Sequence, residues 1–285
     1  MKAELLLVVT TFIWGCTFVI VKGALSDASP LPFVAVRFIL AGILLFAFLS
    51  RCRVDWQAVL PGAVLGVFLF AGYAFQTWGL TLTTPSKSAF ITGFSVILVP
   101  LLALFHGYRM RVANVAGALF GLLGLYFLVL PSGLVGVNRG DVLTLFGAVS
   151  FAFHIVLVGI YTRRHSFLHL VPVQILVVGL LALVGLPFDT GWKFHLTGRL
   201  VFALIITAVL ATGFAFSVQN WAQQYTPPAH TALIFALEPV FAALTSWAFL
   251  AEGLGGKVLW GSGLILGGMI VSEVWGGAAP SPVES

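Results

Sequence analysis

The segment "FQTWGL" (75–80) places a glutamine, Gln76, inside one of the most apolar stretches of the chain. A related segment, "VQNWAQ" (218–223), places Gln219 in the same setting, and in both segments a tryptophan follows two residues later. The two glutamines are 143 residues apart in a chain of 285 residues, which is half of its length. The recurrence indicates that the chain consists of two related halves.

The composition requires a lipid environment. Hydrophobic residues make up 60% of the chain and charged residues 8%, and the mean hydropathy is +1.10. A soluble domain usually carries about 25% charged residues. The apolar runs approach the roughly 20 residues that a helix needs to cross a bilayer, and they lack the alternation that is typical of barrel strands. We therefore expect an all-α integral membrane protein with about ten transmembrane helices.

Turns rich in proline, glycine and serine and short basic segments separate the apolar runs. They predict ten membrane spans, at roughly 4–22, 32–50, 58–80, 86–106, 112–130, 141–161, 168–187, 200–223, 229–250 and 258–275.

The repeat extends over most of each half. Each half holds five predicted spans, and an odd number means that the second half enters the membrane from the opposite side. The sequence thus predicts two inverted repeats, at 1–134 and 135–276, followed by a disordered tail at 277–285. Inverted repeats are common in transporters that work by alternating access. The matched pairs are Trp14 with Phe151, Thr17 with His154, Arg37 with Gln174, Tyr73 with Phe216, Gln76 with Gln219, Trp78 with Trp221, and Pro100 with Pro239.

The loops predict the orientation. Closely paired arginines at 51 and 53, 109 and 111, and 163 and 164 fall on the same side as the N-terminus. The positive-inside tendency then places both termini in the cytoplasm and residues 131–140 outside. The net charge of +5 is spread over short loops, so nucleic acid is not an expected partner. Cys16 and Cys52 are interpreted as free thiols, and the first span as retained.

Three segments resemble one family of membrane proteins. They are "IWGCTFVIVK" (13–22), "SKSAFITGFSVILVPLLAL" (86–104) and "FAFSVQNWAQQYTPPAHTALIFALEPVFAALTSWAFLAE" (214–252), and they are similar to the EamA-type branch of the drug/metabolite transporter superfamily. The resemblance implies ten helices in the inner (plasma) membrane, cytoplasmic termini, and movement of small metabolites through a central cavity. The family's Leu-Gly-Glu type turn has a version at Glu252 but is replaced by "HGYRMR" in the first half.

The polar residues within the spans predict the cavity. An amide in hydrocarbon must find partners, so Gln76 and Gln219 are expected to face the bundle interior. One interpretation is a polar lining for a substrate, and the alternative is interhelical hydrogen bonding that holds the bundle together. The candidate lining residues are Trp14, Thr17, Tyr73, Gln76, Trp78, Ser88, Thr92, His154, Gln219, Asn220, Gln223 and Thr231.

Two residues are candidates for proton coupling, Glu238 and His154. Glu238 is the one acid that we place deep inside a span, where an ionised carboxylate costs about 2.5–3.5 kcal/mol. It would titrate or bind a substrate amine, or instead stabilise a kink at Pro239 through a permanent hydrogen bond. His154 would titrate or act as a structural donor. Pro100 and Pro239 are expected to kink their helices.

Two cations near the ends of the first two predicted spans, Lys22 and Arg37, are interpreted as snorkelling to the membrane interface. The alternative is an anion-attracting mouth.

The sequence holds no Gly-x-Ser-x-Gly, His-Glu-x-x-His or Walker motif, so we predict no enzyme, no cofactor and no metal site. The leading hypothesis is a secondary active transporter that exports small metabolites, amino acids or drug-like compounds, functional as a monomer, with a homodimer as the alternative. The alternative functions are an uncoupled facilitator or channel, and an intramembrane enzyme using Glu238 or the pair Ser150 and His154.

Overall fold

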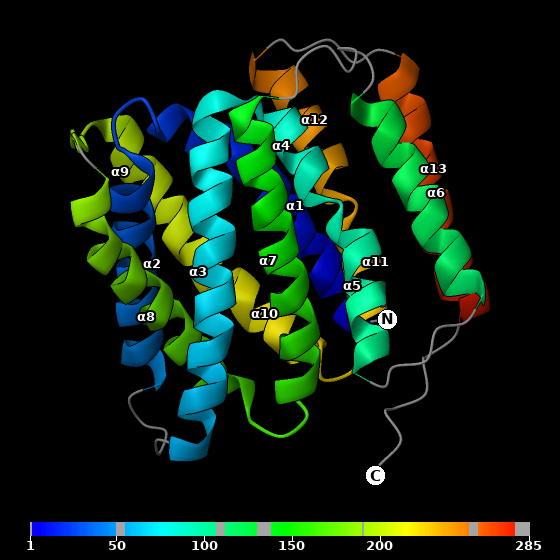
Figure 1. Cartoon of the computed structure of the whole chain (residues 1–285), viewed down its shortest axis with the longest axis horizontal. Helices are drawn as coiled ribbons and strands as arrows, with labels where there is room; N and C mark the ends of the chain where they lie inside the picture. Colours follow the sequence, from blue (N-terminus) through cyan, green and yellow to red (C-terminus); the bar gives the residue numbers. More distant parts are fainter. Residues whose placement is uncertain are drawn as a thin grey trace.

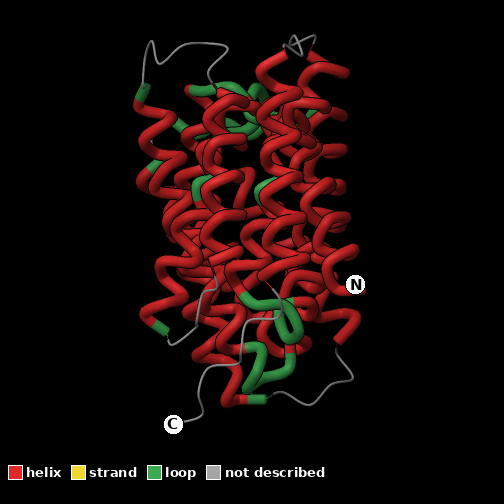
Figure 2. The backbone as a smooth tube through the Cα atoms, turned by 90° about the vertical axis from the view of Figure 1, so that its right-hand side faces the viewer, coloured by secondary structure: helices red, strands yellow, loops and turns green. Residues whose placement is uncertain are grey.

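A computed structural model describes residues 2–49, 55–106, 112–129, 138–189, 191–250 and 256–276. In these ranges all the regular elements are helices (Figure 2). They are α1 (Lys2–Ala24), α2 (Pro30–Leu49), η1 (Trp56–Ala58), α3 (Val59–Leu82), α4 (Pro85–Thr92), α5 (Ser95–Phe105), α6 (Val112–Val129), α7 (Arg139–Tyr161), α8 (Phe167–Gly185), η3 (Leu186–Phe188), α9 (Gly198–Ile206), η4 (Thr207–Phe214), α10 (Ala215–Ala222), α11 (Pro228–Phe235), α12 (Glu238–Leu250) and α13 (Gly256–Gly276).

The described helices include enough long apolar segments for a multi-pass membrane protein. Eight segments are long and apolar enough to cross a bilayer, and a shorter apolar helix covers Val115–Gly124. The count of ten crossings stays a prediction, because α6 and α13 are not among the eight. The eight are Lys2–Ala24, Pro30–Phe48, Trp56–Leu82, Pro85–Phe105, Arg139–Tyr161, Phe167–Phe188, Gly198–Ala222 and Pro228–Phe249.

Several expectations concern residues outside the described ranges. They are the tail at 277–285, the repeat boundary between 134 and 135, most of the loop at 131–140, Cys52, Glu252 and the arginines at 51, 53, 109 and 111.

The helices of the first half pack against those of the second. In the bundle α2 lies beside α8, α3 lies beside both α7 and α8, and α1 lies beside α12. Figure 1 shows α6 and α13 side by side at one end of the bundle. Much of the helix packing therefore joins an element of the first half to an element of the second.

Two of the predicted spans are broken into two helices each. The first break, at Gly93–Phe94, separates α4 from α5, and the second, at Ala236–Leu237, separates α11 from α12. Pro239 is the second residue of α12, where the missing N–H costs little. Pro100 lies inside α5, about two turns after the first break, so α5 continues through this proline.

A third irregularity lies in the eighth predicted span, which was expected to be one continuous helix. Residues Thr207–Phe214 form a π-helical segment, η4, between α9 and α10. Segments of this kind are rare and occur frequently at functional sites. Ala211 and Thr212, in the middle of η4, both accept hydrogen bonds from side chains of the first half.

Candidate functional site

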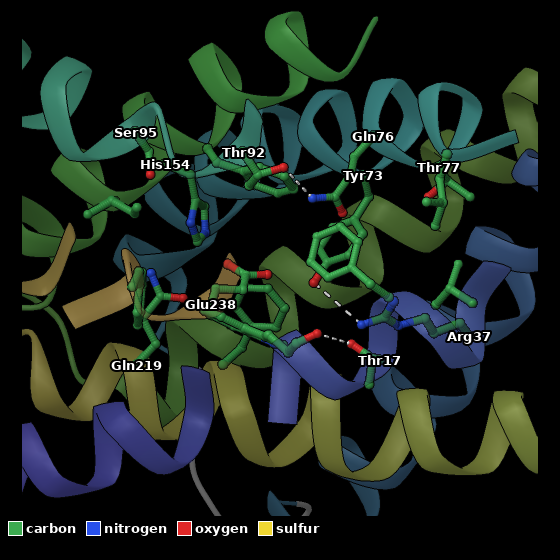
Figure 3. A pocket seen from close by; sticks show the side chains of 18 residues that line it. Thr17, Arg37, Tyr73, Gln76, Thr77, Thr92, Ser95, His154, Gln219 and Glu238 are labelled. Atoms are coloured by element: carbon green, nitrogen blue, oxygen red, sulfur yellow. Dashed lines mark hydrogen bonds between the residues drawn. The ribbon is translucent and has the colours of Figure 1, made fainter. Parts of the chain in front are cut away.

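A cavity lies between the two halves of the chain. Its lining atoms surround about 730 Å³ of empty space, including the part that opens to the outside. The first half contributes residues from α1 to α5, and the second half contributes residues from α7, α10, α11 and α12. Figure 3 shows these side chains converging from both halves.

Eight of the thirteen residues predicted to line the cavity or couple protons do line it. They are Trp14, Thr17, Tyr73, Gln76, Thr92, His154, Gln219 and Glu238. The other five candidates, Trp78, Ser88, Asn220, Gln223 and Thr231, are not part of the lining.

Trp78 lies two residues after Gln76 in α3 but does not line the cavity, and helical geometry explains the difference. Residues two apart on a helix point to nearly opposite sides, whereas residues three or four apart share a face. The α3 side chains that line the cavity are Tyr73, Gln76, Thr77 and Leu80, which follow this spacing. The same rule applied to Tyr73 would have found Thr77 and Leu80 from the sequence.

Gln76 lies on the cavity wall and also forms a hydrogen bond between two helices. Its Nε2 donates a hydrogen bond to Thr92 Oγ1 at 2.9 Å, and the Thr92 hydroxyl donates to the carbonyl of Ser88 at 3.0 Å. The bond joins α3 to α4 while both side chains stay on the cavity wall (Figure 3). The Ser88 hydroxyl itself is buried and has no hydrogen-bond partner among the described residues.

The amides of α10 are divided between the cavity and the helix interface. Gln219 Nε2 donates to Gln223 Oε1 at 3.0 Å, and Gln223 Nε2 donates to the carbonyl of Ile155 in α7 at 2.8 Å. Gln219 Oε1 is buried and accepts no hydrogen bond from a described residue. Gln219 is therefore a lining residue with a free acceptor, and Gln223 holds α10 against α7.

His154 belongs to a buried hydrogen-bond network. Its Nε2 lies 2.7 Å from Gln174 Oε1, and Gln174 Nε2 donates to Asn220 Oδ1 at 3.1 Å. The Asn220 amide donates in turn to the carbonyl of Phe216 at 2.9 Å. Because a carbonyl oxygen only accepts, His154 Nε2 is the donor in this arrangement. The network connects α7, α8 and α10, which explains why Asn220 lies behind the lining.

Glu238 occupies the start of α12 at the cavity wall. Among the described residues no side chain forms a hydrogen bond or an ion pair with its carboxylate. Thr231, a candidate lining residue seven positions earlier, would share this face on a continuous helix, but it is fully buried outside the lining. The break at Ala236–Leu237 explains the difference, because a spacing of seven holds one face only along a continuous helix.

Arg37 does not snorkel to the interface as expected. Its side chain is only 3% exposed, and it lines the cavity. Its Nε donates to Thr212 Oγ1 at 2.8 Å, and the guanidinium lies over the ring of Tyr73, 4.7 Å from the ring centre. The sequence marked the residue as a span-end cation, and its counterpart in the second half, Gln174, is likewise buried in the structure.

Other lining residues were not singled out, although the repeat pointed to some of them. Phe151 and Phe216 line the cavity, and they are the counterparts of Trp14 and Tyr73. Ser95 and Phe235, beside the two helix breaks, also line it. Sequence matching between the halves therefore pointed to lining residues, Phe151 and Phe216, that the search for polar residues had passed over.

Polar links join the two halves at one end of the bundle. Lys87 Nζ lies 2.6 Å from Asp141 Oδ2, and Asp141 Oδ1 accepts a hydrogen bond from the Thr83 hydroxyl at 2.9 Å. In a neighbouring link, the carboxylate of Asp27 is bound by Arg199. Hydrogen bonds from Arg199, and then from Thr197, lower the pKa of Asp27 from 3.8 to about 2.

An all-helical, multi-pass bundle with a polar cavity between its halves defines a membrane protein built to hold a small molecule. Comparison with known proteins identifies the family. The sequence pattern of the EamA-like transporter family matches residues 1–130 and again residues 138–273. The chain belongs to that family, whose members include transporters of the drug/metabolite type.

Individual relatives agree with this assignment. An uncharacterized transporter of Archaeoglobus fulgidus is 37% identical over 94% of this chain and 85% of its own length. The inner membrane transporter YedA of Escherichia coli K12 is 29% identical over 87% of this chain and 81% of its own length. An S-adenosylmethionine/S-adenosylhomocysteine transporter of Chlamydia muridarum is 36% identical, over 37% of this chain and 34% of its own length.

A solved crystal structure shares the fold. It superposes with a TM-score of 0.79 over 97% of this chain and 99% of its own, at 20% sequence identity.

Proposed function

We propose that this protein is a secondary transporter that moves small metabolites, amino acids or drug-like compounds by alternating access. The observation that carries the proposal is the cavity, because both halves line it and it contains two ionisable side chains, Arg37 and Glu238, without an ionic partner among the described residues. Charged groups inside a membrane protein are costly and usually mark a substrate or ion pathway.

The packing of α2 against α8 supports an inverted repeat. A Cβ atom added to Gly42 would collide with Leu176, and one added to Gly179 would collide with Ile39. Residues 42 and 179 are 137 apart, as are 39 and 176, and this is also the spacing of Arg37 and Gln174. Each contact therefore becomes the other when every residue is replaced by its counterpart in the other half, as expected around a two-fold axis.

The packing of α6 against α13 shows the same exchange of contacts between the two halves. A Cβ on Gly124 would lie 2.5 Å from the carbonyl oxygen of Gly261, and a Cβ on Gly268 would lie 2.6 Å from that of Gly117. Residues 117 and 261 are 144 apart, as are 124 and 268. These contacts, together with the two family matches, support two five-helix repeats at 1–134 and 135–276 and hence ten helices.

Different kinds of contact join the two halves at the two ends of the bundle. At one end are the ion pairs Asp27 with Arg199 and Lys87 with Asp141. At the other end an apolar cluster joins the first turns of α1 to the last turns of α5 and α10, through residues that include Leu7, Ala103 and Ala222. If one half rocks against the other, the contacts at one end would separate while the contacts at the opposite end stay intact.

The proposal is tested by transport in reconstituted vesicles. Purified protein in proteoliposomes is offered a panel of radiolabelled amino acids, nucleosides and amphiphilic cations, with and without a pH gradient. Alternating access predicts exchange of labelled for unlabelled solute, and gradient-driven accumulation if transport is proton-coupled. A facilitator equilibrates solutes without accumulation, and an enzyme converts them. No movement and no conversion of any compound would contradict the proposal.

Orientation belongs to the same proposal. We place both termini in the cytoplasm and residues 131–140 outside, which makes the Asp27–Arg199 end of the bundle the outer face. Single cysteines at Arg164 and Ser132 test this by labelling with a membrane-impermeant maleimide in cells. The expected result is that only the cysteine at 132 reacts, and reaction at 164 alone would reverse the orientation.

A further inference from the structure

Arg37 carries a buried positive charge that no described residue neutralises. Its neighbours are the Thr212 hydroxyl, the Ala211 carbonyl and the aromatic rings of Phe38 and Tyr73. In the ranges that the structure describes, no carboxylate comes within ion-pair distance of its guanidinium. A buried charge is normally paired, because the desolvation cost of an unpaired charge is large. The counter-ion of Arg37 is therefore expected to come from outside the chain.

The π-helical segment holds the guanidinium in place from behind. Nε donates to Thr212 Oγ1 at 2.8 Å, and Nη2 lies 3.4 Å from both the Ala211 carbonyl oxygen and the Tyr73 hydroxyl. The Ala211 carbonyl also accepts from Trp14 Nε1 at 2.9 Å. The remaining nitrogen, Nη1, forms no hydrogen bond with a described residue. The guanidinium is thus oriented, with donor capacity left for a planar oxyanion.

The opposite side of the cavity offers acceptors instead of donors. The buried Oε1 of Gln219 has no described donor, and no described side chain forms an ion pair with the Glu238 carboxyl group. In Figure 3 they lie on the left of the view and Arg37 on the right. An anionic group would be repelled at the acceptor side and attracted at Arg37, so the cavity orients a ligand that carries one.

The wall between these polar sides is aromatic. The rings of Trp14 and Phe216 lie 5.3 Å apart, and so do those of Tyr73 and Phe151. Aromatic walls favour an apolar, flat body on the ligand.

We infer that Arg37 is the anion-recognition residue of the cavity and that it selects solutes with a carboxylate on an apolar body. Arg37 is the one Lys or Arg side chain among the described lining residues, so with Glu238 protonated it matches a monoanion, whereas a dianionic phosphate would bring an uncompensated negative charge into the cavity. This assignment rests on the proposed function, since it identifies the substrate class of the same cavity. It is nevertheless tested by binding, which does not require transport.

The test compares carboxylic acids with their neutral amides of the same shape. Detergent-purified protein is titrated with acetate and acetamide, benzoate and benzamide, and 3-phenylpropionate and 3-phenylpropionamide, and affinity is taken from the rise of the unfolding midpoint with concentration. We expect at least one acid to bind about tenfold more tightly than its amide. The inference is overturned if no acid is preferred over its amide.

Variants assign the preference to Arg37. Arg37→Gln is expected to bind acid and amide equally, and Arg37→Lys to retain a reduced preference because a lysine keeps the charge without the fork. Arg164→Gln removes the same charge from an exposed loop and is expected to match wild type. An unchanged preference in Arg37→Gln would overturn the assignment. If that variant does not fold, two others decide, Arg37→Lys and Thr212→Val, the second of which removes the acceptor of Nε. The preference for acids over amides must fall in both, and an unchanged preference in either would overturn the assignment.

Binding and transport separate the two proposals. A protein that prefers acids but moves no solute in vesicles retains the Arg37 assignment and loses the transporter proposal. A protein that transports solutes while binding acids and amides equally loses the Arg37 assignment alone.

Discussion

Asp27 binds Arg199 through two parallel hydrogen bonds, with Nε 2.9 Å from Oδ2 and Nη2 2.9 Å from Oδ1. The same carboxylate accepts a bond from the Thr197 hydroxyl at 2.7 Å, and the backbone carbonyl of Asp27 accepts one from the N–H of His195 at 2.8 Å. Four bonds thus tie the connection between α1 and α2 to the segment that leads into α9. In a transporter of this kind such a link is expected to act as a closure at one face.

The first prediction concerns pH. Arg199 and Thr197 lower the pKa of Asp27 from 3.8 to about 2. Because the folded-state pKa lies below the ordinary one, the link stabilises the protein fully above about pH 4 and loses its effect as the pH falls through about 2. Asp27→Asn should therefore have a lower unfolding midpoint than wild type at neutral pH, and the two curves should converge between about pH 4 and pH 2. A gap that persists at the acid end would contradict the prediction.

The second prediction locks this face. Ala28 and Phe194 face each other in an isolated antiparallel bridge, where Cβ atoms lie about 4.5–5.5 Å apart. Cysteines at both positions, in a background with Cys16 and Cys52 replaced by alanine, should form a disulfide under mild oxidation. Transport should then stop and return on reduction, because alternating access requires this face to open. Either single cysteine serves as the control, and full transport by the crosslinked protein would show that the face does not move.

The third prediction uses two adjacent glycines of α13. A Cβ on Gly268 would lie 2.6 Å from the Gly117 carbonyl oxygen, whereas a Cβ on Gly267 would meet nothing within 4 Å. Gly268→Ala should therefore push α13 away from α6 and lower the stability by about 1–3 kcal/mol. Gly267→Ala, with the same chemical change one residue away, should leave the unfolding midpoint unchanged or slightly raised. Equal effects of the two substitutions would refute the close crossing of these helices.

The fourth prediction separates three roles for Glu238. If it carries a coupling proton, Glu238→Gln should still exchange substrate across the membrane but lose accumulation driven by a pH gradient. If it binds a substrate ammonium, the same variant should lose exchange as well. If it only supports the break before Pro239, the glutamine variant should behave like wild type and Glu238→Leu should be less stable. We expect the first result, measured in vesicles with an imposed gradient.

The composition and the long apolar runs were sufficient to predict a helical membrane protein, and the resemblance of three segments to known sequences indicated its family. The physical reason is that lipid offers backbone groups no hydrogen-bond partners, so long apolar segments must form helices. The repeat added more, because the paired residues Trp14 and Phe151, and Gln76 and Gln219, all line the cavity. The repeat and the polar residues thus pointed to several of the side chains that line the cavity.

Only the tertiary structure decided how individual polar groups are used. Trp78 and Thr231 looked equivalent to their lining neighbours, but the helix phase and the break at Ala236–Leu237 turn them away from the cavity. Arg37 was interpreted as a snorkelling cation near a span end, yet η4 packs against α2 and supplies Thr212 as its partner from 175 residues away. Contacts between residues so distant in the chain depend on how helices pack, and no local pattern encodes them. The sequence therefore determined the helical bundle and pointed to several lining residues, while packing decided which of the predicted residues and which charges the cavity holds.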